Sequence, residues 1–99
     1  MGLKINALAE AAGIQCMIGC FGESSLGLSA AAHLAVARPN ITFIDLDSCY
    51  HFKYDPVQGG VRFDETVGGL LHLPATAGHG AKMLCPIVSS TLHIYLNFY

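Results

Sequence analysis

Two aspartates separated by one residue are the strongest candidates for chemistry in this sequence. Asp45 and Asp47 lie at the end of Ile41–Leu46, whose β-branched and aromatic residues are typical of a strand. Side chains two positions apart on an extended segment point to the same face, so these carboxylates repel each other unless a cation joins them. A ligand ammonium group, a lysine or a metal ion would satisfy the pair. A solvent-facing turn is the alternative interpretation.

A second pair of candidate residues follows the short apolar segment Ile14–Gly19, which favours a buried strand. Cys20 comes directly after this segment, and Glu23 stands between it and the helix expected next. An acidic residue at that position either faces a ligand or complements the positive end of the helix dipole. The sequence leaves both interpretations of Glu23 open.

The cysteines and histidines are not expected to bind metal or to form disulfides. The sequence does not open with the pattern of a signal peptide, so we expect reduced thiols in a cytoplasmic protein. Cys16 and Cys20 would lie about 13 Å apart on an extended strand, too far for a disulfide. The histidines show no zinc-ligand spacing, and His33, on an alanine-rich helix, is expected to pack against its neighbours.

The order of expected elements supplies a scaffold for these candidates. Helical spacing in Lys4–Ala12, with Gly13 as its stop, precedes the first strand. A second helix, N-capped by the side chain of Ser24 or Ser25, runs to Ala37 and precedes the second strand. Helix, strand, helix, strand is the pattern of a parallel α/β fold, where functional residues lie at the carboxyl ends of strands.

The chain changes character after the second expected strand. Asp55-Pro56 and Gly59-Gly60 are turn signals, and Val61–Phe63 and Leu70–Leu73 favour short strands. Met83–Tyr99 carries no formal charge, but polar residues interrupt it and it is too short for a membrane span. We therefore expect no membrane partner.

Composition suggests that the chain belongs inside something larger. It has 99 residues, of which 53% are apolar and 12% charged, against a usual charged share of about 25%. A small domain needs polar residues to cover its surface, and two strands alone leave unpaired edges. The net charge is −2 and there is no basic run, so we expect no nucleic-acid partner.

Taken together, the segments resemble the enolase superfamily, and within it the dipeptide epimerases that act on L-Ala-D/L-Glu. The resemblance covers residues 1–81 and falls at the C-terminal end of that family's chain. The matching runs, in order, are Cys16–Cys20, Glu23-Ser24, Ala30–Ala35, Asn40–Thr42, Ile44–Asp47, Asp55–Val57 and Gly59-Gly60.

The resemblance implies an α/β fold made of the C-terminal βα units of a modified (β/α)₇β TIM-like barrel plus a short β-rich tail. Residues 1–50 would hold the seventh and eighth strands with their helices. Residues 51–81 would return toward the family's capping domain, and residues 82–99 form an apolar tail that matches nothing in the family.

The resemblance also implies an isomerase, a racemase or epimerase acting on a small dipeptide by Mg²⁺-assisted removal of an α-proton. Asp45 and Asp47 would bind the substrate ammonium group, with Glu23 and Cys20 beside them. The family's metal ligands and catalytic lysines have no counterpart here, so Mg²⁺ would be held elsewhere. The isolated chain is expected to be inactive, with the remainder of a barrel or an oligomer partner completing it.

The sequence departs from the family's pattern at two further places, and two alternative functions remain open. Phe21 and Gly22 replace two larger apolar residues of the family, which leaves the exact dipeptide open, and His79 replaces an apolar residue between two glycines. A non-catalytic α/β module pairing with a partner chain is one alternative function. A fragment of a muconate cycloisomerase or o-succinylbenzoate synthase is another, but the substrates of those enzymes carry no ammonium group for the aspartate pair.

Overall fold

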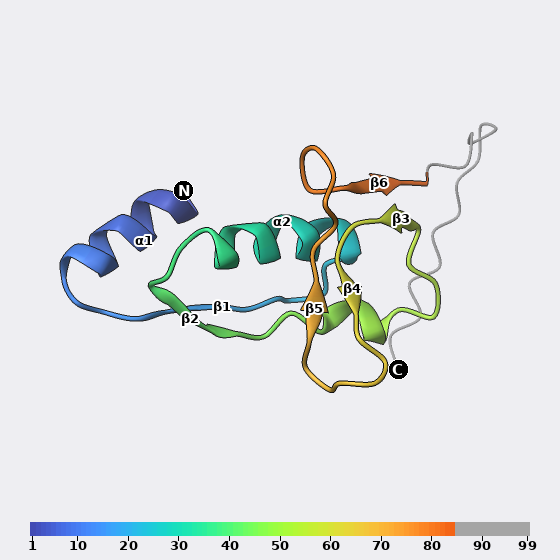
Figure 1. Cartoon of the computed structure of the whole chain (residues 1–99), viewed down its shortest axis with the longest axis horizontal. Helices are drawn as coiled ribbons and strands as arrows, with labels where there is room; N and C mark the ends of the chain where they lie inside the picture. Colours follow the sequence, from blue (N-terminus) through green and yellow to red (C-terminus); the bar gives the residue numbers. More distant parts are fainter. Residues whose placement is uncertain (85–99) are drawn as a thin grey trace.

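A computed structural model describes residues 1–84 of the protein (Figure 1). An α/β half is followed by a β-rich half. The elements in chain order are α1 (Gly2–Ala11), β1 (Cys16–Ile18), α2 (Ser25–Val36), β2 (Ile41–Ile44), a short 3₁₀ helix (Ser48–His51), β3 (Val57–Gly59), β4 (Arg62–Phe63), β5 (Leu71–His72) and β6 (Ala81–Met83).

Helix α1 ends as the sequence predicts. Gly13 has a positive φ of 69°, and its N–H donates to the carbonyl of Glu10. The N–H of Ile14 donates to the carbonyl of Ala9 at 2.8 Å, which completes a Schellman motif. This motif turns the chain out of the helix and into the segment that leads to β1.

Strands β1 and β2 pair in parallel, with α2 connecting them (Figure 1). Met17 is opposite Phe43 and Ile18 is opposite Ile44, with a register shift after Cys16. Because α2 is a crossover connection between parallel strands, the carboxyl ends of both strands meet at one edge of the sheet. The predicted alternation of helix and strand is therefore confirmed, although both strands are shorter than expected.

The start of α2 corrects one expectation. Neither serine side chain caps the helix; Ser24 is the N-cap but makes no side-chain capping bond. Instead, the carboxylate of Asp55, thirty residues further on, accepts the N–H of Ser25 at 2.8 Å. A carboxylate at this position satisfies a free amide and complements the helix dipole, so the β-rich half caps a helix of the α/β half.

The two halves also meet at a buried serine. The hydroxyl of Ser29, which is fully buried, donates to the carbonyl of Ser25 and accepts the N–H of Val61 at 2.8 Å. Gly60 lies so close, with φ +81°, that a Cβ there would stand 2.3 Å from this hydroxyl. The core around this junction comprises Leu28, Ala32, Leu46 and Val61.

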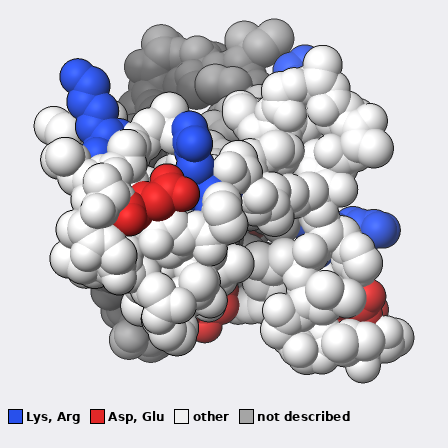
Figure 2. All heavy atoms as spheres, turned by 60° about the vertical axis from the view of Figure 1, so that its left-hand side comes forward, with Lys and Arg blue, Asp and Glu red and all other residues white. Residues whose placement is uncertain are grey.

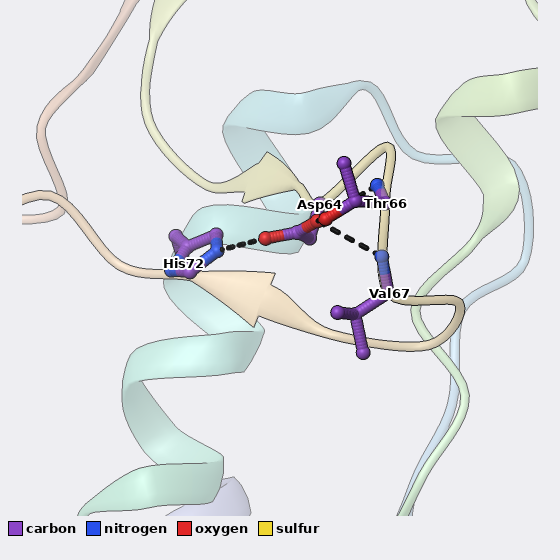
Figure 3. A network of polar contacts seen from close by, with 4 residues as sticks. All are labelled: Asp64, Thr66, Val67 and His72. Carbon is purple, nitrogen blue, oxygen red and sulfur yellow. Dashed lines mark hydrogen bonds and ion pairs between the residues drawn. The ribbon is translucent and has the colours of Figure 1, made fainter.

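The β-rich half consists of two antiparallel pairs, β3 with β6 and β4 with β5. Asp64 organises the turn of the β4–β5 hairpin (Figure 3): its Oδ1 accepts the N–H and hydroxyl of Thr66 and the N–H of Val67. Its Oδ2 lies 2.8 Å from Nε2 of His72. The contact with His72, followed by the bonds from Thr66 and Val67, holds the pKa of Asp64 well below its usual value.

The strands predicted near residues 61–63 and 70–73 are present, whereas β3 and β6 were missed.

Large apolar side chains remain exposed on the α/β half. Leu8 of α1 is 74% exposed, and Met17, Phe43 and Ile44 of the two-stranded sheet are more than half exposed. In Figure 2, acidic and basic side chains lie close together on one part of the forward face, and most of the remaining surface is white. Large apolar side chains left exposed in this way are typical of a surface that packs against further protein.

Among residues 1–84, no helix is both long and apolar enough to cross a bilayer. The uncharged run that ends at Tyr99 lies mostly outside the described residues. The expected boundary at residue 81 stays a prediction; β6 crosses it, since this strand runs to Met83.

Candidate functional site

The predicted aspartate pair lies at the carboxyl ends of β1 and β2, which run in the same direction in Figure 1. The N–H of Asp45 donates to the carbonyl of Ile18 at 3.0 Å, which extends the parallel pairing one step past β2. The ligand atoms of Cys20, Asp45 and Asp47 all lie within 4.8 Å of one another. The structure thus brings together three of the four candidate side chains.

These side chains face a hollow of about 370 Å³. Cys20 is half-buried at its wall and its thiol donates to Oδ1 of Asp47 at 3.8 Å, a long, weak bond to sulfur. Both aspartates are exposed. The remaining lining residues are Phe21, Gly22, Ser48 and His51. No lysine or arginine is among them, and His51 is the one lining side chain that can carry a positive charge.

The loop after β1 is fixed by Glu23. Its Oε2 accepts the backbone N–H groups of Phe21 and Gly22. The bond from the Phe21 N–H, followed by one from the backbone of Glu23 itself, lowers the pKa of Glu23 against an opposing effect of burial. The side chain of Glu23 is absent from the lining of the hollow and turns back onto its own loop. Glu23 therefore accepts loop amides rather than capping the helix, and its predicted role beside a ligand stays a prediction.

Sequence reasoning missed two residues at the hollow, Ser48 and His51, and one at the start of α2, Asp55. Ser48 is buried and its hydroxyl donates to the carbonyl of Glu23 at 2.9 Å, which ties the two strand ends together. His51 lines the hollow, although histidine spacing alone gave no reason to select it. Asp55 caps α2, and its Oδ1 is buried without a hydrogen-bond partner among the described residues. Asp55-Pro56 signalled only a turn, so no local pattern indicated the distant amide.

The thiols and His33 behave as expected. Cys16, Cys20 and Cys49 are free. Burial, then the charge of Asp55, raises the pKa of Cys49, so this thiol stays protonated and unreactive. Nδ1 of His33 donates to the carbonyl of Ser29 at 2.7 Å, within its own helix and away from the hollow. Cys85 lies outside the described residues.

A second, larger hollow of about 440 Å³ lies between α2 and the β4–β5 hairpin. Its walls are mostly apolar and include Ala32, Ala35, Leu70 and Leu71. Asp45 and Asp47 line this hollow as well. The aspartate pair therefore lies between the two hollows, and Cys20 lines only the smaller one.

The donor set of the smaller hollow suits an organic cation better than Mg²⁺. Magnesium prefers six oxygen ligands in octahedral geometry and is commonly held by carboxylates plus water. Here one of the three converging groups is a thiol, which is a ligand for softer metals. An ammonium group needs only hydrogen-bond acceptors of negative charge, and both aspartates provide them.

Comparisons with known proteins identify relatives of this chain. The family described as enolase C-terminal domain-like matches residues 2–85. A hydrophobic dipeptide epimerase of Enterococcus faecalis is 49% identical over 79 residues, which are 79% of this chain and 22% of the relative. The L-Ala-D/L-Glu epimerase of Bacillus subtilis is 42% identical over 77 residues, 78% of this chain and 20% of the relative.

Solved structures agree with the sequence matches. A substrate-liganded complex of the Bacillus subtilis L-Ala-D/L-Glu epimerase superposes with a TM-score of 0.73 at 41% identity, covering 79% of this chain and 21% of that one. The Cytophaga hutchinsonii dipeptide epimerase, complexed with Mg and D-Ala-L-Val, gives 0.75 at 41% identity, covering 82% and 22%. The chain thus spans about a fifth of the length of these relatives, and the predicted fold class is confirmed as a C-terminal piece of their barrel.

Proposed function

Because the chain belongs to the enolase C-terminal domain-like family, we propose that it is the part of a dipeptide epimerase that binds the amino terminus of the substrate. One observation carries the proposal: Asp45 and Asp47 converge at the carboxyl ends of two parallel strands, and no lysine or arginine of the described residues lines the hollow beside them. Carboxylates placed in this way attract a cation, and a dipeptide supplies one as its α-ammonium group.

Each residue of the pair would accept a charge-assisted hydrogen bond from that ammonium group, which has three donors. Two such bonds fix the position of the nitrogen and so the direction in which the dipeptide extends from the strand ends. Cys20 forms the adjacent wall, since its half-buried thiol lies against Asp47. This chain would therefore orient the substrate rather than move its protons.

Proton transfer needs groups that this chain does not place at the hollow. None of its lysines, Lys4, Lys53 and Lys82, lines the hollow, and Lys4 lies on α1, outside the loops that follow the strands. We place the bases and the ligands of Mg²⁺ on the remaining barrel. That ion, when bound there, would stabilise the negative charge that develops when the α-proton leaves.

The proposed partners follow from this separation, in which this chain binds the substrate and the remaining barrel transfers the protons. The substrate is a small dipeptide with a free ammonium group. The exposed edges and apolar side chains of the α/β half would contact the remainder of a barrel or an oligomer partner. Free thiols at Cys16, Cys20 and Cys49 support a cytoplasmic location.

A chimeric enzyme tests the proposal. This chain would replace the matching segment of the Bacillus subtilis L-Ala-D/L-Glu epimerase, and exchange of the α-proton of L-Ala-L-Glu would be followed in D₂O with Mg²⁺. We expect the chimera to exchange the proton and Asp47→Asn to raise KM for dipeptides strongly. N-acylated dipeptides lack the ammonium group. If Asp47→Asn raises their KM as much as it raises the KM of free dipeptides, the amine-binding role is wrong.

The isolated chain provides the matching negative test. It holds no lysine at the hollow, so we expect no exchange of the α-proton above the rate in buffer with Mg²⁺. Exchange catalysed by the chain alone would contradict the proposed division between substrate binding and proton transfer.

A further inference from the structure

We propose that Glu23 is a positioning residue: its carboxylate holds the loop that carries Cys20 and Phe21 against the Asp45–Asp47 pair. This inference rests on the proposed function, because it assigns to Glu23 a role in shaping the cation site rather than in contacting the substrate. It changes the expected result of a mutation, since the charge of Glu23 matters less than its hydrogen-bonding oxygen.

The contacts of Glu23 reach both strand ends. Its Oε2 accepts the N–H of Phe21 and, at 3.0 Å, the N–H of Gly22, so one oxygen holds two consecutive amides of the loop after β1. Its backbone carbonyl accepts the hydroxyl of Ser48, the residue directly after Asp47. Glu23 therefore joins the loop that follows β1 to the segment that follows β2.

The surroundings of Glu23 keep its side chain in this position. Gly27 lies one turn further along, where an added Cβ would stand 2.9 Å from Cβ of Glu23 and 3.2 Å from its Cγ. Real Cβ atoms do not approach so closely, so any larger residue at position 27 forces Glu23, or the backbone that carries it, to shift. The absence of a side chain at position 27 leaves room for the observed geometry.

The loop geometry has a direct consequence for the cation site. Cys20 is half-buried, and its thiol lies 3.8 Å from Oδ1 of Asp47. The ring of Phe21 is fully exposed at the lining of the same hollow. If the amides of the loop lost their acceptor, the thiol and the ring would move relative to the carboxylates. The distance between thiol and carboxylate is therefore a measure of whether the loop is in place.

Thiol reagents of opposite charge can report this distance in the full chain. A cationic aminoethyl methanethiosulfonate and an anionic sulfonatoethyl methanethiosulfonate form the same kind of mixed disulfide with a thiolate and release a sulfinate. Labelling at Cys20 would be quantified by peptide mass spectrometry, with each rate normalised to that of a free cysteine peptide. Two carboxylates within 4.8 Å of the thiol should favour the cationic reagent on the order of tenfold.

Substitutions of Glu23 then separate a positioning role from a direct charge effect. Glu23→Ala removes the acceptor and should reduce the charge preference at Cys20 to near one. Glu23→Gln is nearly the same shape and keeps one carbonyl oxygen, which is all that the two amides use. It should retain most of the preference although it carries no charge. Glu10→Ala, at an exposed position on α1, is the matched control and should change nothing.

Gly27→Ala provides a variant that does not depend on Glu23→Ala being folded. Alanine has a higher helix propensity than glycine, and the only atoms that the added Cβ meets within 4 Å are Cβ and Cγ of Glu23, so the substitution should act at Glu23 and the backbone beside it. The added Cβ should nevertheless displace the Glu23 side chain and reduce the charge preference at Cys20. A lower preference in a chain with an unweakened helix is a result that general destabilisation does not produce.

The outcomes distinguish this inference from the function on which it rests. A wild-type chain without charge preference, or one whose preference survives Asp45→Asn with Asp47→Asn, overturns the cation site itself. A preference that needs the aspartates but survives both Glu23→Ala and Gly27→Ala overturns the positioning role alone. Equal loss in Glu23→Gln and Glu23→Ala also overturns it, because Glu23 would then act through its charge.

Discussion

Two groups of aspartates in this molecule differ in what surrounds them. Asp64, in the β4–β5 hairpin, accepts three hydrogen bonds and lies beside His72, so its own hairpin supplies every partner it needs. Asp45 and Asp47 converge at the strand ends with a single weak bond from Cys20 as their side-chain contact among the described residues. Asp64 stabilises a turn, whereas the pair is left with acceptors free for a ligand.

A lowered pKa alone does not identify a functional carboxylate. The neighbouring His72 and the hydrogen bonds of the turn lower the pKa of Asp64 far below its usual value. These partners already occupy both carboxylate oxygens, so Asp64 is not available to a ligand. Asp45 and Asp47 attract attention through position and convergence instead. In parallel α/β folds, the carboxyl ends of strands are where ligands bind, and the pair lies there.

The largest difference between the two groups should appear in the chimeric enzyme. Replacing both Asp45 and Asp47 with asparagine should lower kcat/KM for free dipeptides about 100-fold, because two charge-assisted hydrogen bonds to the ammonium group are weakened. Steady-state kinetics with L-Ala-L-Glu and its N-acetyl form would measure the effect. An equal loss of kcat/KM for the two substrates would show that the pair, like Asp64, supports the structure and does not bind the substrate amine.

Low pH should destabilise the β4–β5 hairpin. The pKa of Asp64 is lower in the folded chain than in the unfolded chain, so its contribution to folding is present above its usual pKa, about 4. It is lost as the pH falls from there through the folded value. Amide exchange at Thr66 and Val67, corrected for the intrinsic pH dependence, should lose protection several-fold between these limits. Protection that is constant across this range would show that Asp64 does not hold the turn.

Asp64→Asn should reproduce part of the acid effect at neutral pH. Asparagine keeps one acceptor oxygen but loses the charge that faces His72, so protection of Thr66 and Val67 should fall a few-fold. The same substitution in the chimera should leave the KM for dipeptides unchanged. A raised KM would mean that the hairpin and the strand ends are coupled more closely than the contacts indicate.

The smallest effect should come from Cys20→Ser. A hydroxyl replaces a thiol whose bond to Asp47 is long, so KM of the chimera should change by about threefold or less. A much larger change would show that Cys20 also holds the substrate amine. The group compared with Asp64 would then have to include Cys20 as well as Asp45 and Asp47.

Local patterns were sufficient to predict much of the α/β half and its site. Gly13 indicated the end of α1, and the two apolar segments indicated the parallel strands, since these signals depend on neighbours in sequence. The two-residue spacing of Asp45 and Asp47 predicted that the carboxylates share a face, and the structure brings them together. Their role as ligands of a substrate amine stays a prediction.

Long-range contacts explain what the sequence could not reveal. The cap of α2 comes from Asp55, thirty residues after the amide it accepts, so a local search found only the serines. Strands β3 and β6 are short, polar in part and distant from each other in sequence, and only their pairing defines them. The role of Glu23 depends on Gly27 and Ser48, and no spacing rule connects these three residues to a loop geometry.

A crystal structure of the chimera with a bound dipeptide would test the central claim most directly. We expect the substrate nitrogen to lie within about 3.2 Å of a carboxylate oxygen of Asp45 and of Asp47, as charge-assisted hydrogen bonds require. A dipeptide whose ammonium group lies elsewhere in the barrel, while the two aspartates contact only water, would contradict it.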